Sequence, residues 1–463
     1  MIFAVRQLQE KCQEQNRNLY AIFVDLTKAF DSVSREGLWK IMAKYGCPPT
    51  FITMIRQFHD GMMAHVIDDG QTSDRFPVSN GVKQGCVLAP TLFSISFSAM
   101  LSNAFTGVDL GLEIRYRTDG QLFNPRCLKA STWVQITKIV DLLFADDCAL
   151  IATTETKSQE TVDKFSRACD SFGFTINAKK TEVLHKPAPG VTFIEPNIKV
   201  KGTKLQPVDS FTYLGSIISR CVHIDDEINN RIAKASAAFG RLRHTVWDRR
   251  GITLTTKLKV YKAVVLSTLL YACETWTVYS RHARKLQHFH TTRLRIILNI
   301  KWQEKIPDTE VLNRADLPSI HTLLQKNQLR WAGHIHRMPD SRIPKQLFYG
   351  ELSTGKRNVG GQKKRYKDVL KSSLKAADIN WESWESHTSD RVNWRHMINL
   401  GSKYSEQTRI LTAQEKRAIR KARSTSTSIT AESDFKCHLC NRYFRARIGL
   451  ISHLRTHRNQ SST

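Results

Sequence analysis

The sequence has no run near the roughly 18 consecutive apolar residues that a membrane-crossing helix needs. Its first 18 residues lack the short basic start and long apolar stretch of a secretion signal. A disulfide framework is also lacking: the cysteines are scattered singly, apart from Cys437 and Cys440. These absences predict a reducing compartment and no membrane partner.

Acidic residues are scarce relative to basic ones. The chain has 70 Lys and Arg against 42 Asp and Glu, which gives a formal charge of +28. Such an excess favours a polyanionic partner, usually nucleic acid. Charge alone is also compatible with an ordinary basic protein, so the function has to be inferred from the sequence motifs.

The order of elements predicts an α+β fold. A length of 463 residues suggests about three domains, and the hydrophobic periodicity alternates between helix and strand up to about residue 218. Strands are expected at 20–26 and on both sides of a polar turn within 139–152, with a strand-rich insertion at 112–140. Helices are expected at 1–18, 27–45, 90–101 and 156–172.

The second half of the sequence is helical and basic. Ile228, Ile232, Ala235 and Phe239 share one helix face after residue 222. A basic cluster follows at 355–371, and STSTSITAES (424–433) is typical of a flexible linker. The expected domains are 1–220, a thumb-like helical region at 221–300, a basic helical region at 301–423, a linker at 424–434 and a small unit at 435–463.

Three carboxylates are the first candidates for chemistry. Asp25 ends the predicted strand at 20–26, and Asp146 with Asp147 occupy the turn of the predicted hairpin. If those strands pair, the acids meet at one sheet edge, where carboxylates suit Mg²⁺. Two such ions, about 3.5–4 Å apart, serve phosphoryl and nucleotidyl transfer. Taken singly, each acid is more often a turn former or helix cap.

Five ordered segments resemble the palm motifs of reverse transcriptases. Their residues are most similar to those of the enzymes of non-LTR (LINE-type) retrotransposons. The five segments are VDLTKAFDSV (24–33), NGVKQGCVLAPTLFSI (80–95), LLFADDCALIA (142–152), FTINAKKTEVL (174–184) and FTYLGSII (211–218). A weaker likeness continues through LLYACETW (269–276) and RWAGHIHRMPDSRIPKQ (330–346). The resemblance implies a polymerase palm with an antiparallel sheet, followed by a helical thumb.

The resemblance also implies the substrates and the metal. An RNA-directed DNA polymerase takes an RNA template, a DNA primer or target and deoxynucleoside triphosphates, with two catalytic Mg²⁺ ions. Asp25 and Asp146 would be the principal ligands, and Asp147 a weaker or structural partner.

Other motif positions imply supporting roles. Phe30 matches the aromatic residue beneath the nucleotide sugar, although a core phenylalanine is an equally simple interpretation. Gln84 and Gly85 match the loop that lines the template and incoming base, and Phe144 matches the aromatic position before the paired aspartates. Lys180 matches a proton donor to pyrophosphate, although it is also compatible with a solvated lysine.

Tyr213, Leu214 and Gly215 resemble the primer-grip turn. Reverse transcriptases carry a basic fingers segment before the first aspartate, whereas Asp25 is preceded by only 24 residues here. The resemblance therefore implies a truncated copy.

The C-terminal unit has the pattern Cys437-x₂-Cys440-x₁₂-His453-x₃-His457, with apolar Phe435, Phe444 and Leu450 between. This spacing resembles a C₂H₂ finger and predicts one structural Zn²⁺ in a ββα unit.

The finger's usual base-reading positions hold Ala446, Gly449 and Ser452, which offer little to a base edge. We therefore expect non-specific phosphate contacts, or a protein contact. The arginines available for phosphate are Arg442, Arg445, Arg447 and Arg455.

The leading hypothesis is a retrotransposon reverse transcriptase. The alternative is an inactive nucleic-acid-binding relic of one, and a zinc-finger transcription regulator is disfavoured because only one finger is present. The reaction class and the basic charge favour a nuclear location, with the cytoplasm as a further site. The oligomeric state is open.

Overall fold

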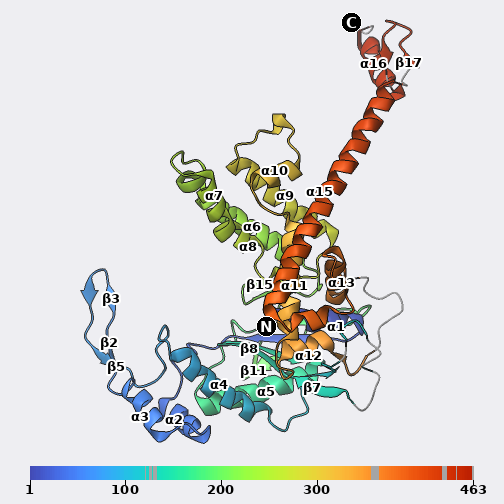
Figure 1. The fold of residues 1–463 in the computed structure, drawn as a ribbon. Helices are drawn as coiled ribbons and strands as arrows, with labels where there is room; N and C mark the ends of the chain where they lie inside the picture. Colours follow the sequence, from blue (N-terminus) through green and yellow to red (C-terminus); the bar gives the residue numbers. More distant parts are fainter. Residues whose placement is uncertain are drawn as a thin grey trace.

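The computed structural model describes residues 1–119, 121–124, 128, 133–355, 364–429, 435–444 and 446–460. The fold mixes helices and sheets, as an α+β polymerase requires (Figure 1). Within the described residues, no helix combines the length and the apolar character that membrane spanning demands.

A five-stranded sheet forms the centre of the palm, in the order β13-β10-β1-β9-β8. Its strands are β1 (Leu19–Val24), β8 (Asp141–Phe144), β9 (Asp147–Ala152), β10 (Glu182–Lys186) and β13 (Gln206–Pro207). All six residues of β1 are buried, because β9 and β10 flank it on both sides. The expected strand and hairpin are confirmed. The sheet is antiparallel except for β13, which runs parallel to β10.

Helices α4 (Ala89–Phe105) and α5 (Glu155–Phe172) cover one face of this sheet. Helix α2 (Arg35–Lys44) packs against α4, and α3 (Pro49–Gln57) packs against α2. The aromatic rings of Phe93, Phe97, Phe165 and Phe174 pack between the sheet and α4 and α5. Two short hairpins form an arm that projects away from α3 (Figure 1): β2 (Met63–Ala64) with β5 (Phe76–Pro77), and β3 (Ile67–Asp68) with β4 (Gln71–Thr72).

The helix predicted over 27–45 is shorter than expected, because α2 begins only at Arg35. The Ser34 side chain accepts a hydrogen bond from the backbone N–H of Gly37, which caps the helix there. Residues 27–33 form turns instead, with Lys28 at φ +50°. The polar capping residue outweighs the apolar periodicity that suggested a longer helix.

The first helix, α1 (Ile2–Glu14), is shorter than the helix predicted over 1–18. It is buried on nearly all sides, including most of its polar side chains. Those side chains have partners from distant segments: Gln9 Nε2 donates to the Ser219 carbonyl at 3.0 Å, and Lys11 Nζ donates to the Gly350 carbonyl at 2.6 Å. Burial is tolerated because these polar groups are hydrogen-bonded.

Glu10 on α1 should make the stability of the protein depend on pH. Its carboxylate accepts hydrogen bonds from the Thr277 hydroxyl at 3.0 Å and the Tyr366 backbone N–H at 2.9 Å. Burial nevertheless raises the pKa of Glu10 to about 7. The folded state therefore holds this proton more tightly than the unfolded state, so the contribution of Glu10 to stability is lost as pH rises from about 4.5 to about 7. The loss is about 3 kcal/mol.

The variant Glu10→Gln keeps an oxygen acceptor and has no charge to bury. We expect its free energy of unfolding to exceed that of the parent chain near pH 8 and to vary less between pH 5 and 8. Urea titrations across this range measure both. Glu36→Gln on exposed α2 is the matched control, and identical pH profiles for the parent chain and Glu10→Gln would contradict the prediction.

A second sheet joins the palm to the C-terminal half of the chain. Its strands are β6 (Leu112–Tyr116), β7 (Gln135–Ile139) and β16 (Glu351–Leu352), in the order β16-β6-β7. The helix α12 (Ile343–Tyr349) directly precedes β16, and Leu347 lies in the same apolar cluster as Leu8. The region expected as a separate basic helical part at 301–423 thus contributes a strand to the palm side.

The helices after the palm form one apolar core that includes Ile228, Ala235 and Phe239, as predicted. This core continues to Leu324, beyond the expected boundary at 300. The helices are α6 (Asp225–Arg241), α7 (Leu254–Val260), α8 (Ser267–Leu269), α9 (Ser280–Ile297), α10 (Asp308–Arg314) and α11 (Ile320–His336).

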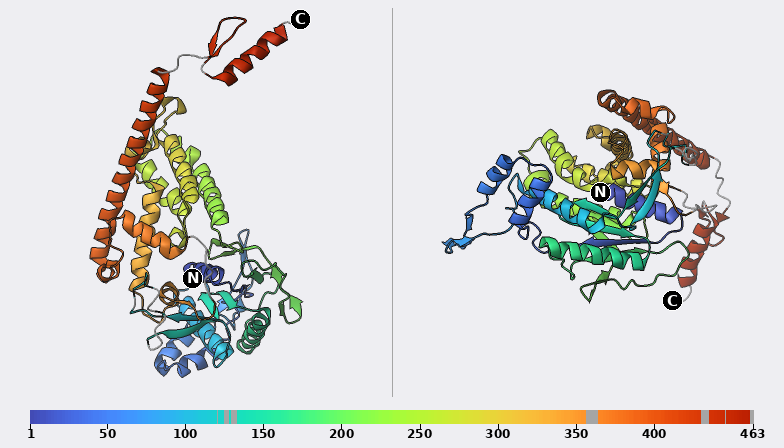
Figure 2. Two further views of the ribbon diagram at one scale, coloured as in Figure 1. Left: turned by 90° about the vertical axis from the view of Figure 1, so that its right-hand side faces the viewer. Right: turned by 90° about the horizontal axis from the view of Figure 1, so that it is seen from below.

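Three further helices follow: α13 (Tyr366–Ala376), α14 (Trp384–Thr388) and the long α15 (Arg391–Ile429). Figure 2 shows α15 running beside the thumb helices. The linker expected at 424–434 is helical through Ile429, and residues 430–434 lie outside the described part. Residues 356–363 of the predicted basic cluster also lie outside it.

Candidate active site

The end of β1 places Asp25 at the sheet edge. Its backbone N–H donates to the Thr181 hydroxyl at 3.2 Å, and its carbonyl accepts from the Asn177 N–H at 2.8 Å. A β-bridge between Leu26 and Ile176 extends the same contact. The segment 175–181 therefore fixes the backbone of Asp25 and leaves its carboxylate available.

The hairpin of β8 and β9 places the other two aspartates. Phe144 and Asp147 form its last pair, so the turn consists of Ala145 and Asp146. Ala145 has φ +53°, a conformation that L-residues rarely adopt and that is often retained at functional sites. Because Val24 pairs with Cys148, the same register continued by one residue places Asp25 opposite Asp147.

The three carboxylates influence one another electrostatically. Burial raises the pKa of Asp147, and the negative charges of Asp146 and Asp25 raise it further. Among the described residues, no lysine or arginine forms an ion pair with Asp25, Asp146 or Asp147. Uncompensated carboxylates at one sheet edge have the donor chemistry that divalent cations require.

Phe30 lies close to this edge. Its ring stacks on Phe93 at 4.5 Å between centroids, and its carbonyl accepts from the Val82 N–H at 2.9 Å. One side of the ring is thus supported by the core. Its position agrees with a core phenylalanine, and the role beneath a nucleotide sugar stays a prediction.

The loop with Gln84 and Gly85 is exposed between the Phe30 segment and α4, and Gly85 has φ +94°. Phe144, 60% exposed, stands beside the turn of the aspartates. The Lys180 side chain is exposed on the segment that holds Asp25. The structure therefore brings these residues to the same region of the palm, and their individual roles stay predictions.

Arg35 holds the base of this loop, a role that the sequence analysis did not predict. The buried guanidinium donates to the carbonyls of Gly81 at 2.9 Å, and of His59 and Val78 at 2.8 Å each. An arginine that satisfies three backbone carbonyls fixes a loop without regular secondary structure. The only signal in the sequence is an arginine beside a helix cap, which does not indicate its partners.

Gly81 should not tolerate a side chain. It has φ +84°, and an added Cβ would lie 2.6 Å from the Asp31 carbonyl oxygen. We expect Gly81→Ala to lower the free energy of unfolding by about 2–4 kcal/mol, because a clash with backbone adds to the left-handed strain. Gly46→Ala is the control, since Gly46 has φ +81° and open space around it. Equal losses of unfolding free energy for the two variants in denaturant titrations would contradict the predicted clash, because they would show that the positive φ alone accounts for the effect.

The predicted primer-grip turn joins β14 (Ser210–Tyr213) to β15 (Ser216–Ser219). Tyr213 is 1% exposed, and its hydroxyl donates to the Leu142 carbonyl at 3.2 Å. This bond ties the turn to β8, the strand that leads into the turn with Asp146. Leu214 and Gly215 both have positive φ, at +49° and +75°.

Thumb residues hold this turn, and the sequence analysis did not predict them. The Tyr271 hydroxyl donates to the Leu214 carbonyl at 2.9 Å, and the Arg231 guanidinium donates to the Gly215 carbonyl. Arg231 also lies over the Tyr271 ring at 4.5 Å and pairs with buried Glu227 at 2.7 Å. The thumb is therefore anchored on the turn of the palm.

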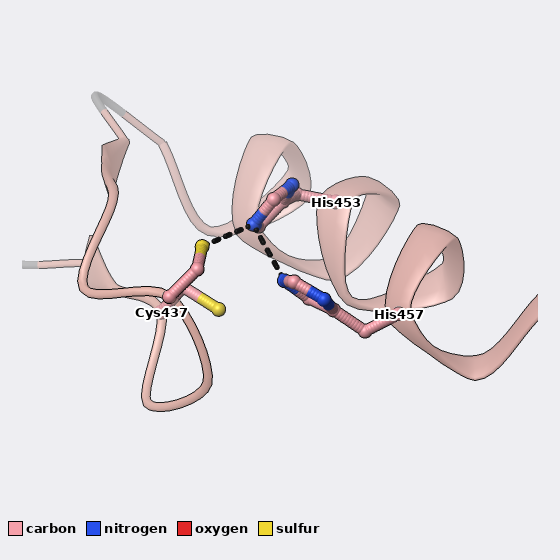
Figure 3. Close-up of side chains that lie close together, drawn as sticks. Cys437, His453 and His457 are labelled. Atoms are coloured by element: carbon pink, nitrogen blue, oxygen red, sulfur yellow. Dashed lines mark hydrogen bonds between the residues drawn. The ribbon is translucent and has the colours of Figure 1, made fainter. Parts of the chain in front are cut away.

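The C-terminal unit forms a hairpin of β17 (Phe435–Lys436) and β18 (Tyr443–Phe444), followed by α16 (Arg447–Gln460). Ligand atoms of Cys437, Cys440, His453 and His457 all lie within 4.8 Å of one another. Figure 3 shows Cys437 from the hairpin facing both histidines of the helix. Two sulfurs and two imidazole nitrogens at this separation fit a tetrahedral metal site.

The finger's surface residues are described only in part. Arg442 and Arg447 are exposed, as are Ala446 and Ser452. Arg445 and the side chain of Arg455 lie outside the described part, so the predicted phosphate contacts rest on the first two arginines here.

Residues 2–218 match the family model described as reverse transcriptase (RNA-dependent DNA polymerase). The chain is similar to a transposon-derived protein of Caenorhabditis elegans, with 26% identity over 273 residues, 56% of this chain and 95% of that protein.

The chain is also similar to the RNA-directed DNA polymerase from mobile element jockey of Drosophila melanogaster, with 24% identity over 338 residues. This covers 70% of the chain and 33% of that polymerase. The Pol polyprotein from the retrotransposable element R2DM of the same fly is 27% identical over 206 residues, 43% of this chain and 17% of that protein.

Proposed function

We propose, from the premise that residues 2–218 of this chain are a reverse transcriptase domain, that the chain extends a DNA primer on an RNA template. The substrates are deoxynucleoside triphosphates. The observation that carries this proposal is the meeting of Asp25, Asp146 and Asp147 at one sheet edge without a cationic side chain to neutralise them.

Asp25 and Asp146 would hold two Mg²⁺ ions, with Asp147 beside them, because carboxylate oxygens are ligands that Mg²⁺ prefers. When bound, such ions supply activation of the primer 3′-oxygen and neutralisation of the leaving pyrophosphate. Lys180 lies on the segment that holds Asp25 and would give a proton to the pyrophosphate.

The flanking residues would orient the nucleotide and the primer. Phe30, supported from below by Phe93, would exclude a 2′-hydroxyl by its bulk. Gly85 permits close approach of the template strand, because no side chain stands there. The turn at 213–215 would hold the primer end against the aspartates, since Tyr213 binds β8 directly.

A primer-extension assay with the full chain tests the proposal. A DNA primer annealed to an RNA template is incubated with the four deoxynucleotides and Mg²⁺, and the product length is measured. Elongation supports the proposal. Binding of the hybrid without elongation would instead identify an inactive nucleic-acid-binding relic.

The C-terminal unit would hold one structural Zn²⁺ in a C₂H₂ finger. Its exposed arginines and the lack of base-reading side chains support phosphate-directed binding. A selection from random duplexes that returned a sharp consensus sequence would contradict this. The reaction class and the charge of +28 favour a nuclear location, which imaging of a tagged chain tests.

A further inference from the structure

A row of basic side chains follows the line where α11 and α15 pack together, here named the α11–α15 seam. The α11 side contributes Lys326, Arg330 and His334, with Arg337 directly after the helix. The α15 side contributes Arg391, Arg395 and Lys403. Most of these side chains are exposed, and none belongs to the carboxylate site.

The spacing of these residues is regular. Lys326, Arg330 and His334 follow one another at intervals of four residues, as Arg391 and Arg395 do. Four residues of an α-helix rise by about 6 Å, so Lys326 with Arg330, and Arg391 with Arg395, present columns of charges at that interval. Burial, and then the charges of Arg337 and Arg391, lower the pKa of His334, so this residue adds no charge at neutral pH. Two adjacent columns form a track rather than a point-like site.

The cations of the seam repel one another. Burial lowers the pKa of Lys326, and the charges of Arg330 and Lys403 lower it further. The pKa of Arg337 is lowered in the same way by burial and then by Arg391 and Arg395. These interactions cross from one helix to the other, which shows that both columns face the same side.

No acid neutralises the seam. Within the described chain none of its seven members forms an ion pair, and Arg337 donates only to the Thr388 carbonyl at 2.7 Å. The helix α11 contains neither Asp nor Glu. On α15, Glu406 is engaged by the hydroxyls of Ser319 and Thr322.

The seam keeps its shape through packing that is independent of these charges. Trp394 of α15 is buried against Gly333, and its Nε1 donates to the Leu329 carbonyl of α11 at 3.1 Å. Like charges four residues apart normally destabilise a helix by a few tenths of a kcal/mol per pair. The fold thus holds an unfavourable charge arrangement in a fixed geometry.

One end of the seam opens into a cavity of about 640 Å³ between α10, α11 and α15. Lys326 and Lys403 line it together with Asp316 and Glu406, so positive and negative side chains balance in its wall. Ser402 also lines the cavity; it is 5% exposed, and its hydroxyl has no hydrogen-bond partner. The uncompensated positive charge is therefore that of the exposed side chains along the seam.

We propose that the α11–α15 seam binds the phosphodiester backbone of a nucleic acid, as a track outside the carboxylate site. This rests on the proposed function, because a polymerase that acts on nucleic acid brings such a backbone to the chain. Phosphates at the cations remove the repulsion that the protein leaves uncompensated.

The test compares two full-length variants with equal loss of charge. The seam variant carries Arg330→Gln, Arg391→Gln, Arg395→Gln and Lys403→Gln. The control variant carries Lys40→Gln, Lys44→Gln, Lys199→Gln and Lys375→Gln, which are exposed and form no ion pair in the described part. Binding of single-stranded RNA and of duplex DNA of equal length is measured from low to moderate salt.

Each lost phosphate contact lowers the slope of log affinity against log salt by about 0.7–0.9. For at least one of the two nucleic acids, we expect the magnitude of this slope to be smaller by about 2 to 4 in the seam variant than in the parent chain. The affinity of the seam variant at about 0.1 M salt should be more than tenfold lower. The control variant should lose clearly less. The nucleic acid whose binding slope changes, RNA or DNA, is identified as the ligand of the seam.

Equal slopes for the two variants with both nucleic acids would overturn the inference. A folding defect is distinguished by thermal melts, because removal of mutual repulsion should leave the melting temperature unchanged or raise it. Primer extension by the parent chain is measured in parallel. The absence of primer extension would contradict the proposed function. The salt slopes test nucleic-acid binding by the seam independently of that result.

Discussion

Replacing Asp146 with alanine should reduce primer extension on an RNA template by about 10³-fold or more, which corresponds to about 4 kcal/mol in the barrier. Asp146 occupies the exposed turn between β8 and β9 and would be a principal ligand of the catalytic ions. Its loss leaves only Asp25 and Asp147 to hold two divalent cations. The measurement is single-turnover extension at saturating nucleotide and Mg²⁺.

The fold should tolerate this change. Asp146 is exposed and contributes to the charge repulsion that raises the pKa of Asp147, so its removal should leave the melting temperature unchanged or slightly higher. Asp209→Ala removes an exposed acid that pairs with Arg220 on the surface, and serves as the control. Synthesis by Asp146→Ala at the parent rate would refute the assignment of the site.

Removal of zinc should unfold the C-terminal unit and leave the rest of the chain folded. The hairpin of β17 and β18 has two residues in each strand, and the core around Phe444 and Leu450 is too small to offset the entropy of ordering. Metal binding in such fingers contributes about 10–16 kcal/mol at neutral pH, and this energy is the folding energy.

We expect one zinc per parent chain by elemental analysis and none in Cys437→Ala. Protease should cut within 435–460 in the variant or after chelation, while the palm stays resistant. Cys221→Ser, a change at an exposed cysteine outside the finger, should keep the zinc. A finger that stays protease-resistant in Cys437→Ala would contradict a structural metal.

Much of the palm could be predicted because its signals are local. The buried strand before Asp25 and the hairpin around Asp146 each consist of apolar residues next to one another in sequence. The same holds for the finger, whose ligands follow a fixed spacing along a hairpin and one helix. Such patterns need no knowledge of distant contacts.

Other parts could not be predicted, because their partners are far away in the chain. Lys11 meets the carbonyl of Gly350, separated by 339 residues, and Arg6 meets Ser216, separated by 210. From the sequence alone, α1 is a helix that contains many polar residues. Only the fold shows that four segments far from it, at 216–219, 277, 350 and 366, form hydrogen bonds with those residues.

The sequence by itself determined which residues are candidates for chemistry in this protein. Three aspartates at a strand end and a hairpin turn, and two cysteines and two histidines at finger spacing, are residue types suited to divalent metal ions. The tertiary structure decided what supports and surrounds that chemistry: the loop held by Arg35, the turn clamped by Tyr271 and the basic seam along α11 and α15. The reason is physical. The type of a metal-binding side chain can be read from a single residue, whereas its electrostatic and hydrogen-bond partners depend on which segments folding brings together.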